Sequence, residues 1–265
     1  MKHSINNIDF SAIKMLACSL NTIKSKPFIN NKVRMIMSKE QNENKKAAAF
    51  FDYDGTLTPY TMVHSYIFMN MVKLKGLKRW LFAVQQLFLA LFYLVFDKVN
   101  THRFNYYFFR KYKGMNYKEL CNDYAETFEQ TFKANLFDEM KEIVHKHKKE
   151  GCDIVIISAS PDVVIKPIAQ YFGADKYYTR ILEVKNGKVT GELESNFMKT
   201  VDKTAAVLDY AEKNNIDLSR SYAYGDSSQD VAMFNLVGNS CLVKGSSKKL
   251  RELAREKKWT IINPT

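Results

Sequence analysis

Short, continuous apolar runs alternate with amphipathic stretches along most of the chain. The first run, Ala47–Phe51, follows the polar segment Glu40–Lys46 and stops at Asp52, which is typical of a strand buried on both faces. Two later stretches, Pro161–Phe172 and Lys203–Lys213, have the spacing of helices with one apolar face. Further apolar runs occur at Ile154–Ile157, Tyr177–Ile181, Tyr222–Tyr224 and Cys241–Val243. This alternation predicts an α/β fold in which helices wrap a parallel sheet.

Two segments do not follow this alternation of strands and helices. Within Leu182–Leu193, the Asn186-Gly187 pair predicts a β-hairpin with a type I′ turn. Residues 61–150 show no convincing strand, so we expect an all-helical domain inserted into the α/β domain. The α/β domain then comprises residues 46–60 and 151–265. We expect residues 1–45 to form a disordered extension.

One stretch of the helical insert, Trp80–Phe96, is apolar at all positions except Gln85 and Gln86 and is flanked by lysines and an arginine. It is shorter than the about 20 residues of a membrane-spanning helix. Three interpretations stay open: it fills the core of the insert, it lies on a membrane surface, or it is one of a spanning pair. A single crossing is excluded, because it would separate Asp52 from Ser158.

The composition narrows the class of protein. With 265 residues, 46% of them apolar, the chain has enough apolar material for a core, which excludes wholesale disorder and a small disulfide scaffold. Forty Lys and Arg against 28 Asp and Glu leave a net charge of +12, which favours anionic partners. The four cysteines lack zinc-site spacing and, with no secretory h-region, predict a reducing, cytoplasmic location. We favour Met37 as the initiator over a targeting segment.

The strongest candidate for chemistry is the run Asp52-Tyr53-Asp54-Gly55-Thr56, placed where a buried strand ends. Ligands bind at this edge of open α/β sheets. A turn at Gly55 lets one carboxylate bind a metal and attack as a nucleophile while the other handles protons. A calcium loop is excluded, because the positions that would need Gly and Glu hold Leu57 and Val63.

Two further elements suit an anion. Ser158 follows the Ile154–Ile157 run, and Ser160 is predicted to cap a helix that begins at Pro161, whose free N–H groups favour a phosphate. Lys203 shares a helix face with Val207, so its ammonium is predicted to face inward.

Acidic residues follow the Tyr222–Tyr224 run in Gly225-Asp226-Ser227-Ser228-Gln229-Asp230. Asp226 lies in the turn and Asp230 one helical turn later, so both can face one pocket. An all-oxygen set of ligands without a basic neighbour suits Mg²⁺. Nucleophile, proton carrier, hydroxyl, cation and metal ligands are the parts that phosphoryl transfer needs.

The order of these four motifs resembles the haloacid dehalogenase superfamily, and over about residues 46–263 the phosphoserine-phosphatase-like branch, subfamily IB, with a helical cap between the first two motifs. The resemblance implies a Rossmann-like core and a Mg²⁺-dependent phosphatase acting on a phosphate monoester. In that reading Asp52 becomes a transient aspartyl-phosphate and Asp54 serves as acid and base. The phosphoryl group would be bound by Ser158 and Lys203, with Thr56 and Ala159 contributing to the phosphate site.

The resemblance also implies a metal site built from Asp52, the backbone carbonyl of Asp54 and Asp226. Asp230 would orient Lys203 or a metal-bound water. True phosphoserine phosphatases carry, nine positions after the nucleophile, an acidic residue that pairs with the substrate ammonium, but Thr61 stands there in this chain.

The substrate is therefore open between a small metabolite and a lipid phosphate. The insert contains a group of basic and aromatic residues, Arg103, Tyr106, Tyr107, Arg110 and Lys113. These side chains would either bind an anionic head group or form a solvent-exposed helix face. The helical insert would then meet a membrane surface or a phospholipid. The alternatives are a phosphotransferase acting on an acceptor alcohol, a basic nucleic-acid-binding protein and a membrane-binding scaffold. We expect no nucleic-acid partner, because no module for one is recognisable.

Overall fold

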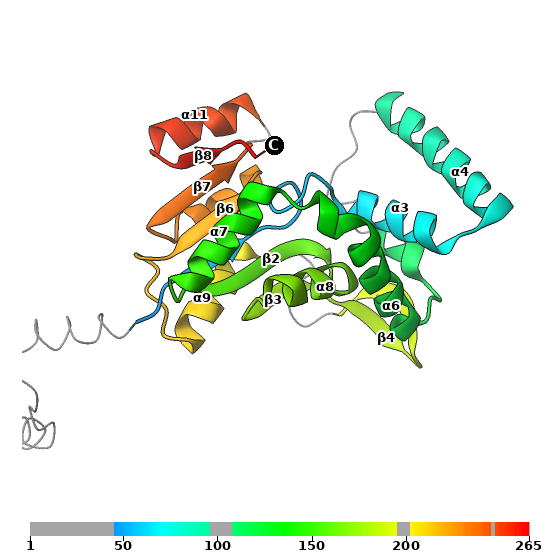
Figure 1. Cartoon of the computed structure of the whole chain (residues 1–265), viewed down its shortest axis with the longest axis horizontal. Helices are drawn as coiled ribbons and strands as arrows, with labels where there is room; N and C mark the ends of the chain where they lie inside the picture. The colour runs from blue at the N-terminus through cyan, green and yellow to red at the C-terminus, as the bar shows by residue number, and fades with distance from the viewer. Residues whose placement is uncertain (1–44, 96–107, 195–201, 245–246, 265) are drawn as a thin grey trace, which may run out of the picture. The chain divides into compact units, whose positions relative to one another are not determined.

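A six-stranded parallel sheet lies at the centre of the computed structural model, which describes residues 45–95, 108–194, 202–244 and 247–264 (Figure 1). Its strands, in spatial order, are β3 (Lys176–Arg180), β2 (Asp153–Pro161), β1 (Ala48–Phe51), β6 (Tyr222–Gly225), β7 (Asn239–Val243) and β8 (Thr260–Ile262). The predicted α/β fold with a parallel sheet is confirmed. The expectation of a disordered extension before the first strand falls outside the described residues.

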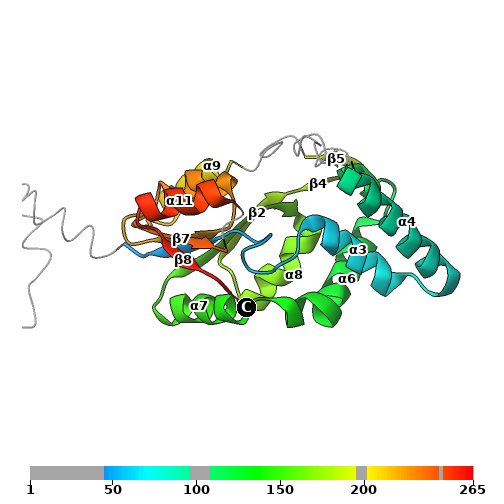
Figure 2. The same ribbon diagram turned by 90° about the horizontal axis from the view of Figure 1, so that it is seen from above.

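Alternate residues of β1 face opposite layers of helices. Ala49 and Phe51 belong to an apolar cluster with α7 (Asp138–Lys149) and α8 (Asp162–Phe172). Ala48 and Phe50 belong to another cluster, with α9 (Lys203–Lys213), α10 (Val231–Phe234) and α11 (Lys248–Glu256). Figure 2 shows these layers on the two faces of the sheet. Burial on both faces explains why β1 is continuously apolar.

The helical insert follows the turn after β1. Its helices are α3 (Met62–Lys73), α4 (Gly76–Val95), a 3₁₀ turn (Arg110–Tyr112), α6 (Tyr117–Thr127), a π turn (Phe128–Phe132), a 3₁₀ turn (Lys133–Asn135) and α7. Met69, Leu120 and Tyr124 are buried in the same apolar cluster as Phe51 of the sheet. The described part of the insert and one face of the sheet therefore share a core.

The predicted hairpin is formed by β4 (Leu182–Lys185) and β5 (Lys188–Leu193). Asn186 and Gly187 both have positive φ, 51° and 74°, as a type I′ turn requires. The insert is joined to the hairpin, because the backbone N–H groups of Gly114 and Tyr117 donate to the carbonyls of Val189 and Gly187 at 2.8 and 2.9 Å.

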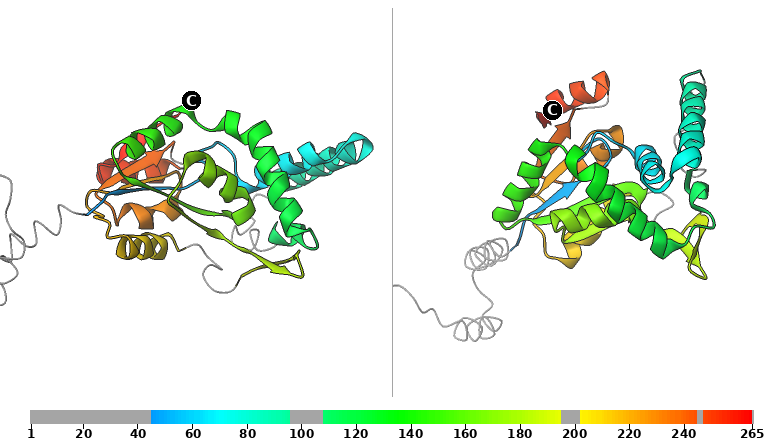
Figure 3. Two further views of the ribbon diagram at one scale, coloured as in Figure 1. Left: turned by 60° about the horizontal axis from the view of Figure 1, so that its bottom comes forward. Right: turned by 45° about the vertical axis from the view of Figure 1, so that its right-hand side comes forward.

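Helix α4 lies at the outer side of α3, away from the sheet (Figure 3). Trp80 and Leu87 are each 61% exposed and Leu77 is 71% exposed. The interpretation of the stretch Trp80–Phe96 as insert core is therefore wrong for Trp80 and Leu87, whereas Leu77 precedes that stretch. Within the part of the chain that the structure describes, no helix is long and apolar enough to cross a membrane.

Candidate active site

The carboxyl ends of β2, β1 and β6 lie side by side (Figure 1). The first and fourth motifs follow β1 and β6, and Ser158 lies within the last part of β2. Asp52 continues β1, and its backbone N–H donates to Tyr224 O at 2.9 Å. Phe51 pairs with Ile156 of β2, two residues before Ser158. Strand order thus brings the motifs to the edge of the sheet where ligands bind in open α/β folds.

A tight turn follows β1 and needs a glycine. The backbone N–H groups of Thr56 and Leu57 both donate to Tyr53 O, at 3.1 and 3.0 Å. Gly55 has φ +78°, and a Cβ added there would lie 2.5 Å from Asp226 Oδ2. A left-handed conformation and this close approach together exclude a side chain at Gly55. The turn therefore brings the first motif against the fourth.

Lys203 is a buried ammonium held between two carboxylates. It is the first residue of α9. The N-cap residue of this helix, Asp202, accepts hydrogen bonds from the backbone N–H groups of Thr204 and Ala205. The Nζ of Lys203 lies 2.8 Å from Asp52 Oδ1 and also donates to Asp230 Oδ1. Lys203 and Val207 are both buried, so the predicted shared face of this helix is present.

Asp230 uses both carboxylate oxygens within the protein. Its Oδ2 accepts from the backbone N–H groups of Asp226 and Ser227, at 3.1 and 2.9 Å, and from Ser227 Oγ at 2.9 Å, while Oδ1 accepts from Lys203. A Cβ at Gly225 would lie 2.3 Å from the Asp230 carboxyl carbon. Asp230 therefore organises the fourth motif and positions Lys203.

Asp54 is bound by two serines. Its Oδ2 accepts from Ser158 Oγ at 3.1 Å and from Ser160 Oγ at 2.7 Å. The expectation that Ser160 caps a helix beginning at Pro161 is wrong: β2 runs on through Pro161, which itself is the N-cap, and α8 begins at Asp162. The Ser160 hydroxyl is free for Asp54 because the strand continues. Sequence reasoning missed this contact.

The charges at this site are buried and unequal. Burial raises the pKa of Asp52 and of Asp54 above their ordinary values. Burial, and then the charge of Asp230, raises the pKa of Asp226 to about 6. Burial alone would lower the pKa of Lys203, but the charges of Asp52 and Asp230 outweigh it and raise it. One ammonium thus faces several carboxylates, and the surplus negative charge favours a cation.

The donor set fits Mg²⁺. Asp52, Asp226 and Asp230 each offer an oxygen within 4.8 Å of the others. Asp54 Oδ1 is buried without a hydrogen-bond partner in the described chain. Oxygen-only ligands from a few carboxylates are typical of Mg²⁺ sites that retain water. Since Asp230 is saturated by protein donors, Asp52 and Asp226 are the carboxylates with oxygens left for a metal.

Other predicted residues lie at the rim of this group. Thr56 is buried, with Oγ1 3.5 Å from Asp52 Oδ2, and Ala159 is half-buried between the two serines. Thr61 is the N-cap of α3, where it forms a capping box with His64. Thr61 is thus a structural residue of the insert.

The predicted head-group residues are only partly described. Arg110 Nη2 lies 3.4 Å from Glu192 Oε1, in an ion pair whose side chains are about half exposed, and Lys113 is exposed. Arg103, Tyr106 and Tyr107 lie outside the described residues.

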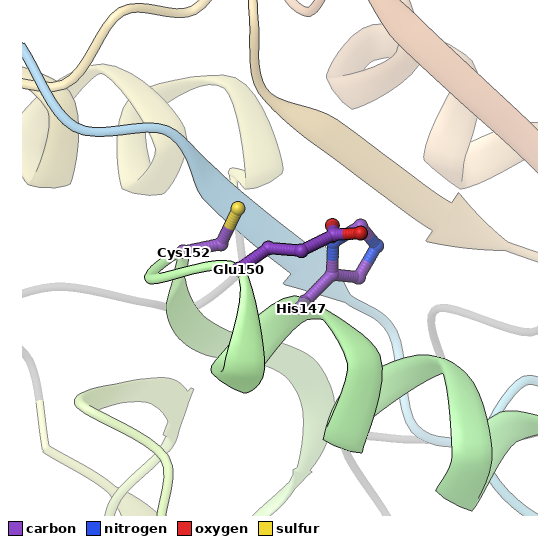
Figure 4. Close-up of side chains that lie close together, drawn as sticks. All are labelled: His147, Glu150 and Cys152. Atoms are coloured by element: carbon purple, nitrogen blue, oxygen red, sulfur yellow. The ribbon is translucent and has the colours of Figure 1, made fainter.

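A second group of metal-binding residue types lies where α7 leads into the amino end of β2 (Figure 4). His147 Nε2 is 2.7 Å from Tyr224 Oη, and its ring packs on Tyr222 with centroids 4.3 Å apart. Its Nδ1 is 3.7 Å from Glu150 Oε2, and Cys152 is half-buried nearby. The contacts of His147 attach α7 to β6 on one face of the sheet, the face that also carries the Phe51 ring.

Comparison with known proteins identifies a family, two relatives and a solved structure that this chain resembles. A family model described as haloacid dehalogenase-like hydrolase matches residues 49–235. A Streptomyces azureus protein described as an inhibition of morphological differentiation protein is 30% identical over 86% of this chain and 82% of its own length. A probable phosphatase of Mycobacterium tuberculosis is 25% identical over 82% of this chain and 75% of its own length. A solved phospho-aspartyl intermediate analogue of phosphoserine phosphatase has a TM-score of 0.57 at 20% identity, covering 83% of this chain and 94% of that chain.

Proposed function

The chain belongs to the haloacid dehalogenase-like hydrolases, in their phosphoserine-phosphatase-like branch, and on that premise we propose that it is a Mg²⁺-dependent phosphatase that hydrolyses a phosphate monoester through an aspartyl-phosphate. The observation that carries the proposal is Lys203 between Asp52 and Asp230, beside the serine-bound Asp54. A nucleophile and a proton carrier from the turn after β1 meet there with a cation from α9 and a carboxylate from the fourth motif.

The roles follow from the contacts. Asp52 attacks phosphorus, and Lys203, which already touches its Oδ1, binds an oxygen of the transferred phosphoryl group. Asp54, whose pKa is raised by burial, keeps a proton for the leaving oxygen and then takes one from the attacking water. Ser158 and Ser160 orient the Asp54 carboxyl, and Ser158, Thr56 and Ala159 border the phosphate.

Mg²⁺ held by Asp52, the Asp54 carbonyl and Asp226 would supply positive charge that neutralises the phosphoryl oxygens. The full-length protein should release inorganic phosphate from an aryl phosphate with Mg²⁺ present and lose this activity with a chelator. Activity that survives chelation, or that is equal in an Asp52→Asn variant, would contradict the proposal. Transfer of the phosphoryl group to an added alcohol, with a new phosphate ester formed in place of inorganic phosphate, would instead favour a phosphotransferase.

For the domain organisation we propose an α/β domain of residues 46–60 and 151–265 with residues 61–150 as the cap.

We further propose that the cap contacts a membrane surface through α4, which exposes Trp80 and Leu77 beside Lys78 and Arg79. The protein should then sediment with vesicles rich in anionic lipid, and the Trp80→Gln variant should sediment less. A lipid phosphate is thus one substrate class to test, beside small metabolites.

A further inference from the structure

Arg180 is a buried cation with no ion-pair partner among the residues that the structure describes. It ends β3 and is 6% exposed, and arginine remains charged at any physiological pH. Among the described residues its guanidinium has no hydrogen-bond acceptor and no carboxylate at ion-pair distance, and Nε is buried without a partner. Its one described contact of note is the ring of Phe109, with Cζ 5.3 Å from the centroid. Buried arginines are almost always paired, so this one calls for an anion.

The strand pairing places Arg180 beside the proton carrier. β2 and β3 shift register after Ile157, and Arg180 then pairs with Pro161, the residue after Ser160. Thr179, next to Arg180, donates from Oγ1 to Ser160 O. Ser160 in turn holds Asp54. The end of β3 is therefore tied to the element that positions Asp54.

The electrostatics indicate the side of the site on which Arg180 acts. Burial lowers the pKa of Arg180, and Asp54 is the carboxylate whose charge opposes that effect. Asp52, by contrast, is neutralised by Lys203. Asp54 stands where the leaving oxygen is protonated, so Arg180 lies on the leaving-group side. Phe109 brings the insert to the same place.

We propose that Arg180 binds a second oxyanion of the substrate, a carboxylate or a further phosphate carried by the leaving group. This inference rests on the proposed phosphatase function and specifies its substrate class. A guanidinium with free N–H donors binds either oxyanion in a bidentate manner, and the pair gains strength away from water. The Phe109 ring lies beside the guanidinium but accepts none of its N–H hydrogen bonds in the plane, so Nε is left without an acceptor among the described residues. The substrate is then a phosphate monoester of an anionic alcohol.

Matched esters test this proposal on the full-length protein with Mg²⁺. Phosphoglycolate and ethyl phosphate differ by the carboxylate, and 1,3-propanediol bisphosphate and 3-hydroxypropyl phosphate differ by the second phosphate. We expect wild-type kcat/KM to be at least tenfold higher for the anionic member of one pair, mainly through KM. The pair that shows the preference identifies the oxyanion.

Arg180→Gln should lower kcat/KM for the anionic ester by about 10- to 100-fold, a loss typical of removing one charge-assisted pair. The neutral ester should change by less than threefold. Arg180→Lys keeps the positive charge but lacks the planar guanidinium, so it should retain part of the preference for the anionic ester. This variant provides a second test if Gln at this position disturbs folding. Lys176→Gln is the matched control, because Lys176 lies on the same strand, is exposed and also packs on a ring, that of Tyr178.

Three results would overturn the inference. Wild-type protein that hydrolyses both members of each pair equally would remove the anion preference. An Arg180→Gln loss that is the same for anionic and neutral esters would assign Arg180 to positioning Asp54. Failure of the wild type on an activated aryl phosphate would overturn the phosphatase function and this inference with it, whereas aryl phosphate turnover without the preference would overturn the inference alone.

Discussion

The carboxyl end of the central sheet and its amino end each gather side chains of types that bind metals. At the carboxyl end, Asp52 and Asp230 contact a single ammonium, that of Lys203, and the three side chains come from three separate segments. At the amino end, His147 is bound to a tyrosine hydroxyl and packed among aromatic rings, while Glu150 is about half exposed. The difference lies in what each group already contacts.

Residue type alone is therefore a poor guide to a site in this fold. The carboxyl end holds surplus negative charge and, among the described residues, an unpartnered Asp54 Oδ1, which together favour binding of a cation. The amino end uses His147 to attach α7 to the sheet. We expect substitutions at the carboxyl end to change turnover and those at the amino end to change stability only.

The largest effect is expected for Asp52→Asn. The amide has nearly the same shape but is a poor nucleophile, so kcat should fall by about 10⁴-fold or more. The thermal unfolding midpoint should show that the fold is retained. Turnover within a few-fold of the wild type would show that Asp52 is not the nucleophile.

Lys203→Met should destabilise the protein as well as inactivate it. Removing the cation leaves Asp52 and Asp230 buried without it, and breaking such a buried arrangement costs about 3–5 kcal/mol of unfolding free energy. The matched control is Lys213→Met at the other end of α9, where the exposed pair with Asp209 is worth about 0.5 kcal/mol. Equal denaturant midpoints for the two variants would remove the argument that Lys203 balances buried charge.

These buried contacts also show which features of the site can be predicted from sequence patterns. The runs at β1 and β6 and the motifs after them could be predicted, because a parallel sheet gathers strand ends at one edge whatever its details. The partners of Asp54 and the position of Arg180 could not, because they depend on how far β2 continues and on its register with β3. Local patterns suggested a Ser160 cap, and strand pairing overrode it.

Mg²⁺ should stabilise the carboxyl end selectively. A ligand that binds only the folded state at a hundred times its Kd adds about 2.7 kcal/mol to the unfolding free energy. Asp226→Asn should lose most of this gain, whereas Cys152→Ser at the amino end should keep it. A gain that persists in Asp226→Asn and disappears in Cys152→Ser would move the metal site to the amino end.

The smallest effect is expected at His147, where it appears only as a dependence on pH. Burial lowers the pKa of His147 below its ordinary value of 6.5, so the folded protein holds this ring neutral while the unfolded chain takes up a proton first. The wild type should therefore lose stability as the pH falls through 6.5 toward the lowered value, and His147→Gln should lose less over the same interval. Urea midpoints at pH 7.5 and pH 5 would measure this, with His145→Gln, exposed on the same helix, as the control. Activity at pH 7.5 should be unchanged in both variants, and a large loss in His147→Gln would connect the amino end of the sheet to the reaction.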